Sequence, residues 1–274
     1  MPSLISPDAI YEQLGLPHSP VIVDVRNEGQ YRAQPRLIPG AFRGDSDDVG
    51  RWARGLPRTR PVAVYCERGD HVSCAIADEL VAKGYPASFL EGGFAAWVRA
   101  GHPTVRARSD LNAPGGSRWV TRARPKIDRL ACPWLVRRFI DPDAVFFYTP
   151  AHRVRSEAEV LRAEPYDITG VTFSHRGPRC SFDAFLDEFD LHDRVLDQLA
   201  DIVRAADTGE LAQSREAPGL LAISLGMSAN VADDILLMEE AMQIYDALYS
   251  WCKTARHETH AWPQAQDSRH VTVS

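Results

Sequence analysis

The chain has 274 residues, of which 45% are hydrophobic and 25% charged, and its formal net charge is −6. This length allows two ordinary domains, and the composition is that of a soluble globular protein. The negative charge argues against broad binding to the phosphate backbone of nucleic acids, and no apolar run approaches the roughly 18 residues of a membrane span. We therefore expect neither nucleic acid nor a membrane as a partner.

The N-terminal segment MPSLISPDAIYEQLG has no basic start and no long apolar run, so it predicts a cytoplasmic protein rather than a secreted one. The five cysteines are an odd number and contain no CxxC pair. They predict reduced thiols rather than a disulfide framework or a structural zinc knuckle.

Strand-like and helix-like patterns alternate over the first hundred residues. Compact apolar runs predict strands over residues 21–25, 61–66 and 87–93. Helical patterns follow or precede them over residues 6–15, 73–85 and 94–101. This alternation is typical of an α/β fold with a parallel sheet and flanking helices.

The second half has a different pattern. Its periodicity predicts long helices over residues 193–209 and 231–255, and a hairpin around residues 144–150 and 168–177. We expect a second, mainly helical domain. The predicted boundaries are a first domain over 1–104, a linker over 105–117 rich in Pro, Gly and Arg, a second domain over 118–255 and a flexible tail over 256–274.

One cysteine, Cys66, ends the predicted strand over residues 61–66. Ligands of parallel α/β sheets bind beyond the carboxyl ends of strands, where helices begin. The loop after Cys66 can turn its backbone N–H groups inward, and a helix from about Ser73 would point its positive end at the same place. Both effects favour a reactive thiolate. The alternative is a buried structural cysteine.

Four motifs around this cysteine occur in a fixed order: VDVR at 23–26, IPGA at 38–41, VYC at 64–66 and LEGGFAAW at 90–97. Residues 5–104 thereby resemble the rhodanese family of sulfurtransferases. The resemblance implies that Cys66 is the nucleophile, that Asp24 and Arg26 support the fold, and that no cofactor is required for sulfur transfer. The implied cradle for the persulfide is formed by Glu67, Arg68, Gly69, Asp70, His71 and Val72.

The sequence departs from the family pattern at several places. The usual histidine before IPGA is absent, and the spacing from Cys66 to Gly84 is one residue longer, which we assign to the loop. Val72 stands where related phosphatases need an arginine, so phosphatase activity is disfavoured. Acidic and basic residues in the loop offset each other, which favours a donor other than thiosulfate. Cys74 could resolve the persulfide, or could simply pack on the sheet.

The second half contains WVTRARPKIDRLACPWLVRRFIDPDA, TFSHRGPRCSFDAF, AADTGELAQSREAPGLLAISLG and YDALYSWC. From about residue 118 to 252 it resembles the C-terminal domain of the ChrB family of chromate-resistance proteins. Regulators of that family carry a separate DNA-binding N-terminal domain, whose place is taken here by the rhodanese-like half. The resemblance implies a link to oxyanion or redox stress without DNA binding.

The residue types in this half suit two kinds of site. Thiol, imidazole and carboxylate groups are transition-metal ligands, whereas clustered arginines bind oxyanions. The candidate residues are Asp128, Arg129, Cys132, His175, Arg179 and Cys180. The alternatives are a buried ion pair for the first two and, for Cys132, an ordinary buried thiol before a proline in a helix's first turn.

The sequence thus predicts a stress-linked sulfurtransferase that uses a small-molecule sulfane-sulfur donor and a thiol acceptor through Cys66. Its second domain would sense or bind an oxyanion or an unidentified transition metal, or deliver an acceptor thiol. The alternative, from a different functional class, is a non-catalytic regulatory or metal- or oxyanion-binding module of chromate resistance.

Overall fold

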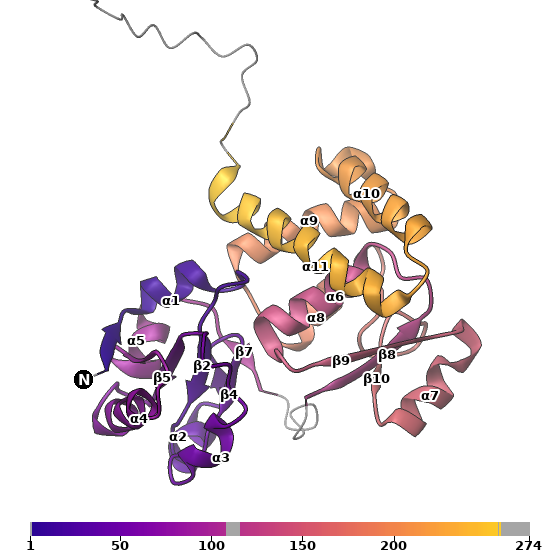
Figure 1. The fold of residues 1–274 in the computed structure, drawn as a ribbon. Coiled ribbons are helices and arrows are strands. Elements are labelled where there is room, and N and C mark those ends of the chain that lie inside the picture. Colours follow the sequence, from indigo (N-terminus) through magenta and orange to yellow (C-terminus); the bar gives the residue numbers. More distant parts are fainter. Residues whose placement is uncertain (1, 108–115, 257, 259–274) are drawn as a thin grey trace, which may run out of the picture.

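The computed structural model describes residues 2–107, 116–256 and 258 (Figure 1). The first half contains the strands β1 (Ser3–Ile5), β2 (Val21–Asp24), β3 (Arg36–Leu37), β4 (Ala41–Arg43), β5 (Val62–Tyr65), β6 (Ala87–Leu90) and β7 (Val105–Arg106). Its helices are α1 (Pro7–Gln13), α2 (Glu28–Ala33), α3 (Val49–Ala53), α4 (His71–Ala82) and α5 (Gly93–Arg99).

Five strands of this half form a parallel sheet in the order β1-β6-β5-β2-β4, which confirms the predicted α/β fold. Successive side chains of a strand point to opposite faces. Val62 and Val64 of β5 therefore pack in one cluster with residues of α3 and α4, whereas Ala63 and Tyr65 pack in another with residues of α1 and α5. Both faces are covered, as expected of parallel sheets.

The predicted elements of this half are all present, but α4 begins at His71, two residues earlier than expected. Asp70 caps it, because its carboxylate accepts a hydrogen bond from Val72 N. The loop between β5 and α4 is therefore residues 66–70. The short elements β1, α2, β3, β4, α3 and β7 were not predicted, because so few residues carry too little periodicity.

The second half contains the strands β8 (Arg118–Arg122), β9 (Val145–Thr149) and β10 (Glu164–Pro165). Its helices are α6 (Asp128–Leu135), α7 (Val154–Leu161), α8 (Ser181–Glu188), α9 (Arg194–Thr208), α10 (Ala217–Asn230) and α11 (Asp234–Ser250). Short π-helical turns follow α6 and α11, over Val136–Ile140 and Trp251–Ala255. The half is mainly helical, as predicted, and none of the described helices has the length and apolar character to cross a membrane.

The predicted hairpin in this half is wrong. β9 pairs in parallel with β8, and β10 pairs with the other edge of β8, also in parallel. The segment 168–177 contributes only isolated bridges. An apolar run predicts a strand but not the strand with which it pairs. Here the chain forms α6 after β8 and then returns as β9 to pair with β8. The helices α6 and α8 cover one face of this small sheet and α7 the other (Figure 1).

Pro133 lies inside α6 rather than in its first turn, because the helix begins at Asp128. A proline within a helix leaves the carbonyl four residues earlier without its amide donor. Here the Tyr166 hydroxyl donates to that carbonyl, Arg129 O, over 3.3 Å. The helix thus continues past the proline, and Cys132 is fully buried beneath it.

A continuous core joins the two halves. Gly15 faces Phe139 and Tyr249 so closely that a Cβ built on it would lie 2.4 Å from the Phe139 ring. Gly40 N donates to Phe139 O over 2.6 Å, and Lys253 Nζ donates to Tyr11 O over 2.7 Å. The two halves are therefore packed together directly.

The expected linker and tail fall partly outside the described residues, namely at 108–115, 257 and 259–274. Of the expected linker, Val105–Arg106 form β7 and pair antiparallel with β3.

Candidate functional site

Cys66 directly follows β5, at the carboxyl edge of the parallel sheet. Its side chain is buried, with only 3% of the residue exposed. β5 lies between β2 and β6, so the cysteine is near the middle of the sheet edge, where the loops after several strands converge.

The Cys66 sulfur has three polar neighbours. Its thiol donates to Asp70 Oδ1 over 3.1 Å, and the Ser73 hydroxyl lies 3.2 Å away. Asp70 N donates back to the sulfur over 3.4 Å. The thiol's hydrogen bond holds the pKa of the Asp70 carboxyl below its ordinary value. The N–H and the start of α4 attract negative charge on sulfur, whereas the Asp70 carboxylate repels it.

The loop after Cys66 is fixed by α5. Phe94 N donates to Cys66 O and Ala95 N to Glu67 O, so the first turn of α5 binds the loop's carbonyl groups. Gly93 has a φ of 60°, and a Cβ there would lie 2.4 Å from both Cys66 O and Gly69 N. Gly93 is therefore required here, because the loop backbone occupies the space that a side chain would fill.

Asp24 and Arg26 form a fully buried ion pair beside this loop. Arg26 Nε and Nη2 both donate to the Asp24 carboxylate, and Nη2 also donates to Arg36 O over 2.6 Å. The guanidinium stacks 3.9 Å above the Phe94 ring, and Nη1 lies 3.8 Å from Glu67 Oε2. Arg26 thus contacts the loop at Glu67 but not the Cys66 sulfur, and Asp24 holds Arg26 in place.

The exposed residues that follow Cys66, which we call the rim, include acidic, basic and apolar side chains. Arg68, Asp70, His71 and Val72 are exposed, and the last two belong to the first turn of α4. The apolar side chain of Val72 is 45% exposed. The rim therefore offers one strong cation, Arg68, against the nearby carboxylate of Asp70.

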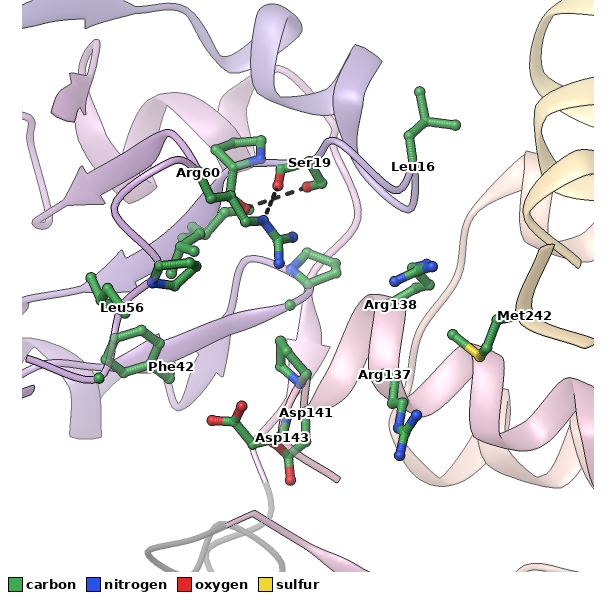
Figure 2. A pocket seen from close by; sticks show the side chains of 18 of the residues that line it. Leu16, Ser19, Phe42, Leu56, Arg60, Arg137, Arg138, Asp141, Asp143 and Met242 are labelled. Carbon is green, nitrogen blue, oxygen red and sulfur yellow. Dashed lines mark hydrogen bonds between the residues drawn. The ribbon is translucent and has the colours of Figure 1, made fainter. Parts of the chain in front are cut away.

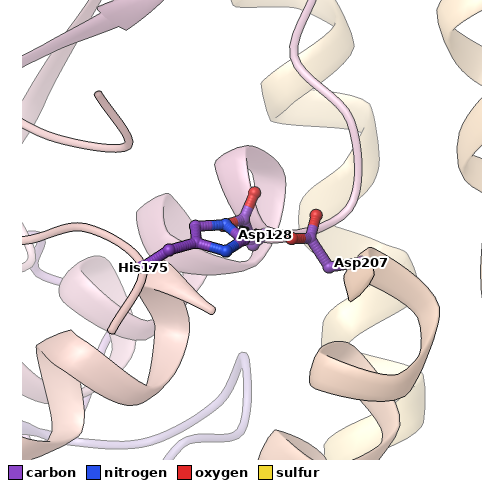
Figure 3. A group of neighbouring side chains, drawn as sticks. All are labelled: Asp128, His175 and Asp207. Carbon is purple, nitrogen blue, oxygen red and sulfur yellow. Dashed lines mark hydrogen bonds and ion pairs between the residues drawn. The ribbon is translucent and has the colours of Figure 1, made fainter. Parts of the chain in front are cut away.

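A second group of reactive side chains lies in the other half (Figure 3). Asp128 begins α6, His175 comes from the loop before α8, and Asp207 lies near the end of α9. His175 Nε2 is 3.2 Å from Asp128 Oδ2 and 3.2 Å from Asp207 Oδ2. These carboxylates raise the pKa of His175 to about 9, and burial together with Asp128 raises that of Asp207 to about 8.

The backbone before Asp128 is strained. Ile127 has a φ of 42° and a ψ of −103°, a region that β-branched residues rarely adopt. It is held there from both sides, because Ile127 N donates to Ser224 Oγ over 2.9 Å and Tyr245 Oη donates to Ile127 O over 2.6 Å. α10 and α11 thus fix the point at which Asp128 enters the cluster.

Asp167 supports this cluster from behind. Its Oδ2 is 2.6 Å from Arg122 Nη2 and 3.1 Å from Arg129 Nε, and its Oδ1 accepts from Ser181 Oγ over 2.9 Å. The same Oδ1 is 3.4 Å from His175 Nε2. Two arginine charges are therefore directed at Asp167.

Of the predicted second-half residues, Asp128, Arg129 and His175 come together in this cluster. Cys132 and Cys180 are buried close by, and burial raises the pKa of both thiols well above the ordinary value, so they stay protonated. Arg179 lies elsewhere and binds Asp187 with both Nη atoms. Sequence reasoning missed Asp167 and Asp207. The latter lies on a helix whose polar positions look like an ordinary solvated face.

A cavity of about 440 Å³ lies between the two halves (Figure 2). Arg60 lines it from the first half, and Arg137 and Arg138 line it from the π-helical turn after α6. Burial, together with the neighbouring Arg138, lowers the pKa of Arg60. The guanidinium donates from Nε to Ser19 O over 2.7 Å. The sequence carried no signal for this cavity, because its lining comes from segments far apart in the chain.

Comparisons with known proteins match the two halves separately. Residues 6–100 match the model of the rhodanese-like domain, and residues 119–252 match that of the C-terminal domain of ChrB. Protein ChrB of Cupriavidus metallidurans is 34% identical over 150 residues, which are 54% of this chain and 45% of that protein. The tRNA sulfurtransferase of Desulfurococcus amylolyticus is 37% identical over 91 residues, which are 33% of this chain and 17% of that protein. The chain thus spans less than half the length of these curated relatives.

Two solved structures are similar to the first half. A rhodanese-related protein from Thermoplasma volcanium is 23% identical, covers 39% of this chain and 100% of its own, and has a TM-score of 0.34. The thiosulfate sulfurtransferase from Pseudomonas aeruginosa is 26% identical, covers 40% of this chain and 20% of its own, and has the same TM-score of 0.34.

Proposed function

Because the chain joins a rhodanese-like domain to a ChrB C-terminal domain, we propose that it transfers sulfane sulfur through a persulfide on Cys66. The observation that carries this proposal is the position of Cys66. It is held at the sheet edge by a loop whose carbonyls are bound by α5, with an amide N–H and the start of α4 directed at the sulfur.

The chemistry takes two displacements at sulfur. The Cys66 thiol first loses its proton to solvent, and the thiolate attacks the outer sulfur of the donor. The donor's S–S bond breaks, and its electron pair leaves on the departing thiolate or sulfite. The thiolate of an acceptor then attacks the outer sulfur of the Cys66 persulfide, which returns Cys66 as a thiolate. No cofactor enters either step.

The surroundings of Cys66 favour a small donor with little negative charge. The sulfur is almost fully buried, so only a small group reaches it. The Asp70 carboxylate next to the sulfur repels a dianion such as thiosulfate, and Arg68 is the only arginine or lysine of the loop residues 67–70. A persulfide or polysulfide of a low-molecular-weight thiol fits this setting better.

Intact mass spectrometry tests the proposed transfer. After incubation of the full chain with an inorganic polysulfide, we expect a gain of one sulfur atom per chain. Cyanide or an excess of thiol should then remove it, because both attack the outer sulfur. A chain that gains no sulfur from polysulfide, thiosulfate or glutathione persulfide would refute the proposal.

Asp70→Asn should speed persulfide formation. Asparagine still caps α4, but the charge beside the sulfur is gone. A charge pair at this distance near a surface is worth about 1 kcal/mol or more, so we expect the rate with thiosulfate to rise about tenfold at low salt. The measurement is the rate of adduct formation by mass spectrometry.

The matched control is Asp78→Asn, an exposed carboxylate on the same helix, which should leave the rate unchanged. If Asp70→Asn instead slows the reaction, the carboxylate acts as a proton acceptor, and our assignment of a repulsive role is wrong.

For the whole chain we propose a cytoplasmic role in chromate-type oxyanion or redox stress. This is supported by the similarity of its second half to the C-terminal domain of ChrB. The alternative is a non-catalytic regulatory or binding module, and the carboxylate beside Cys66 is the observation that favours it. The sulfur-adduct experiment separates the two.

A further inference from the structure

The cluster of Asp128, His175 and Asp207 is not used by the sulfur-transfer proposal and lies in the other half of the chain. Its donor atoms come from three separate segments and all lie within 4.8 Å of one another. They consist of one imidazole nitrogen and two carboxylate oxygens (Figure 3).

The two His175–carboxylate distances lie at the long end of the hydrogen-bond range. Charge-assisted N–H···O bonds are about 2.7–2.9 Å long, and one imidazole N–H can point to only one acceptor. His175 Nε2 is instead 3.2 Å from both Asp128 Oδ2 and Asp207 Oδ2. Two ligands bound side by side to one metal ion at about 2.1 Å are roughly 3.0–3.4 Å apart. The observed separations match this spacing.

The two carboxylates share one cationic partner, His175, when its imidazole is protonated. Donor oxygens of Asp128 and Asp207 lie within 4.8 Å of each other, so two ionised carboxylates here would repel each other unless a cation lay between them. Only 3% of the Asp128 side chain is exposed. Among the described residues, neither aspartate has an ion pair with an arginine or lysine. A cation that binds both would satisfy them.

The surrounding charges indicate a divalent ion. Arg122 and Arg129 are directed at Asp167 and offset its charge. A metal ion replaces the proton of His175, so the ligand imidazole is neutral and the remaining charge on Asp128 and Asp207 is minus two. Carboxylates suit hard ions such as Mn²⁺, and an imidazole suits first-row transition metals.

We propose that Asp128, His175 and Asp207 bind a divalent first-row metal ion of the Mn²⁺ type. Neighbouring groups orient the ligands, since Ser181 N donates to Asp128 Oδ2 over 3.2 Å. His175 is 40% exposed, which gives the ion a path from solvent. The bound ion joins the start of α6, the loop before α8 and the end of α9.

Titration of the metal-free full chain with Mn²⁺, followed by electron paramagnetic resonance, tests this site. We expect saturable binding of one ion by the wild type. Asp207→Asn should weaken binding at least about tenfold, because it replaces a charged ligand by a neutral one. Asp201→Asn is the matched control on the same helix, where the exposed side chain pairs with Arg204, and it should bind as the wild type does.

Thermal melting separates a lost ligand from a damaged fold. Mn²⁺ should raise the melting temperature of the wild type and of Asp201→Asn but not of Asp207→Asn. If Asp207→Asn does not fold, His175→Gln, at a partly exposed position, replaces it with the same expectation. Unsaturable binding by the wild type, or equal affinity in the ligand variants, would overturn the proposal. Cys66→Ala should bind Mn²⁺ normally, so this result stands apart from that on sulfur transfer.

Discussion

Cys66→Ala is expected to abolish the sulfur adduct completely. The adduct needs a thiol that can act as a nucleophile, and Cys66 directly follows β5, with Asp70 N and the start of α4 directed at its sulfur. Burial raises the pKa of Cys132 and Cys180 strongly and that of Cys252 to about 11, so these three thiols remain protonated. The measurement is intact mass after treatment with polysulfide, with wild type and variant side by side.

Cys74→Ala is the control for this prediction. Cys74 is partly exposed and lies in the first turns of α4, so it is the other thiol that a donor could reach. We expect this variant to form the adduct at the wild-type rate. An adduct that persists in Cys66→Ala and disappears in Cys74→Ala would move the nucleophile to Cys74 and contradict the proposed function.

Arg26→Met is expected to destabilise the protein by about 3–5 kcal/mol, since removing one partner of a buried ion pair leaves an uncompensated charge. Here the charge left behind is that of Asp24, whose side chain has no exposed surface. The carbonyl groups of Gln34 and Arg36 also lose a donor. For a chain of this size the melting temperature should fall by about 10 °C, as measured by calorimetry or circular dichroism.

Two variants check the cause of this loss. Arg32→Met removes an arginine that is largely exposed and paired within α2, and it should change stability by less than about 0.5 kcal/mol. Asp24→Asn combined with Arg26→Met removes both charges and should recover part of the loss. An Arg26→Met protein that is within 1 kcal/mol of the wild type would show that the pair does not support the loop as we infer.

The first half could be predicted well because its signals are local. The apolar runs at 21–25 and 61–66 and the motif glycines at 92–93 each depend on a few neighbouring residues. The exact start of α4 could not be predicted, because Asp70 and Ser73 are both plausible caps. Only the structure shows that Asp70 caps the helix and also contacts the Cys66 sulfur.

The second-half cluster could be predicted only in part. Asp128 and His175 stood out because they lie in unusual local sequences, whereas Asp207 looks like a solvated residue on an amphipathic helix. Three segments must be folded together before their shared contacts exist, and no local pattern encodes that. Arg179 was predicted to belong to the same site for a similar reason. It is close to His175 in sequence, but its side chain binds Asp187.

The packing at Gly15 limits which modules could be exchanged at this position. Its φ of 77° favours glycine, and the rings of Phe139 and Tyr249 occupy the space where any side chain would begin. A related N-terminal module transplanted onto this second half would therefore need a glycine at the same point after α1. The packing of these two modules thus depends on one backbone position, Gly15, as well as on the apolar core that both halves share.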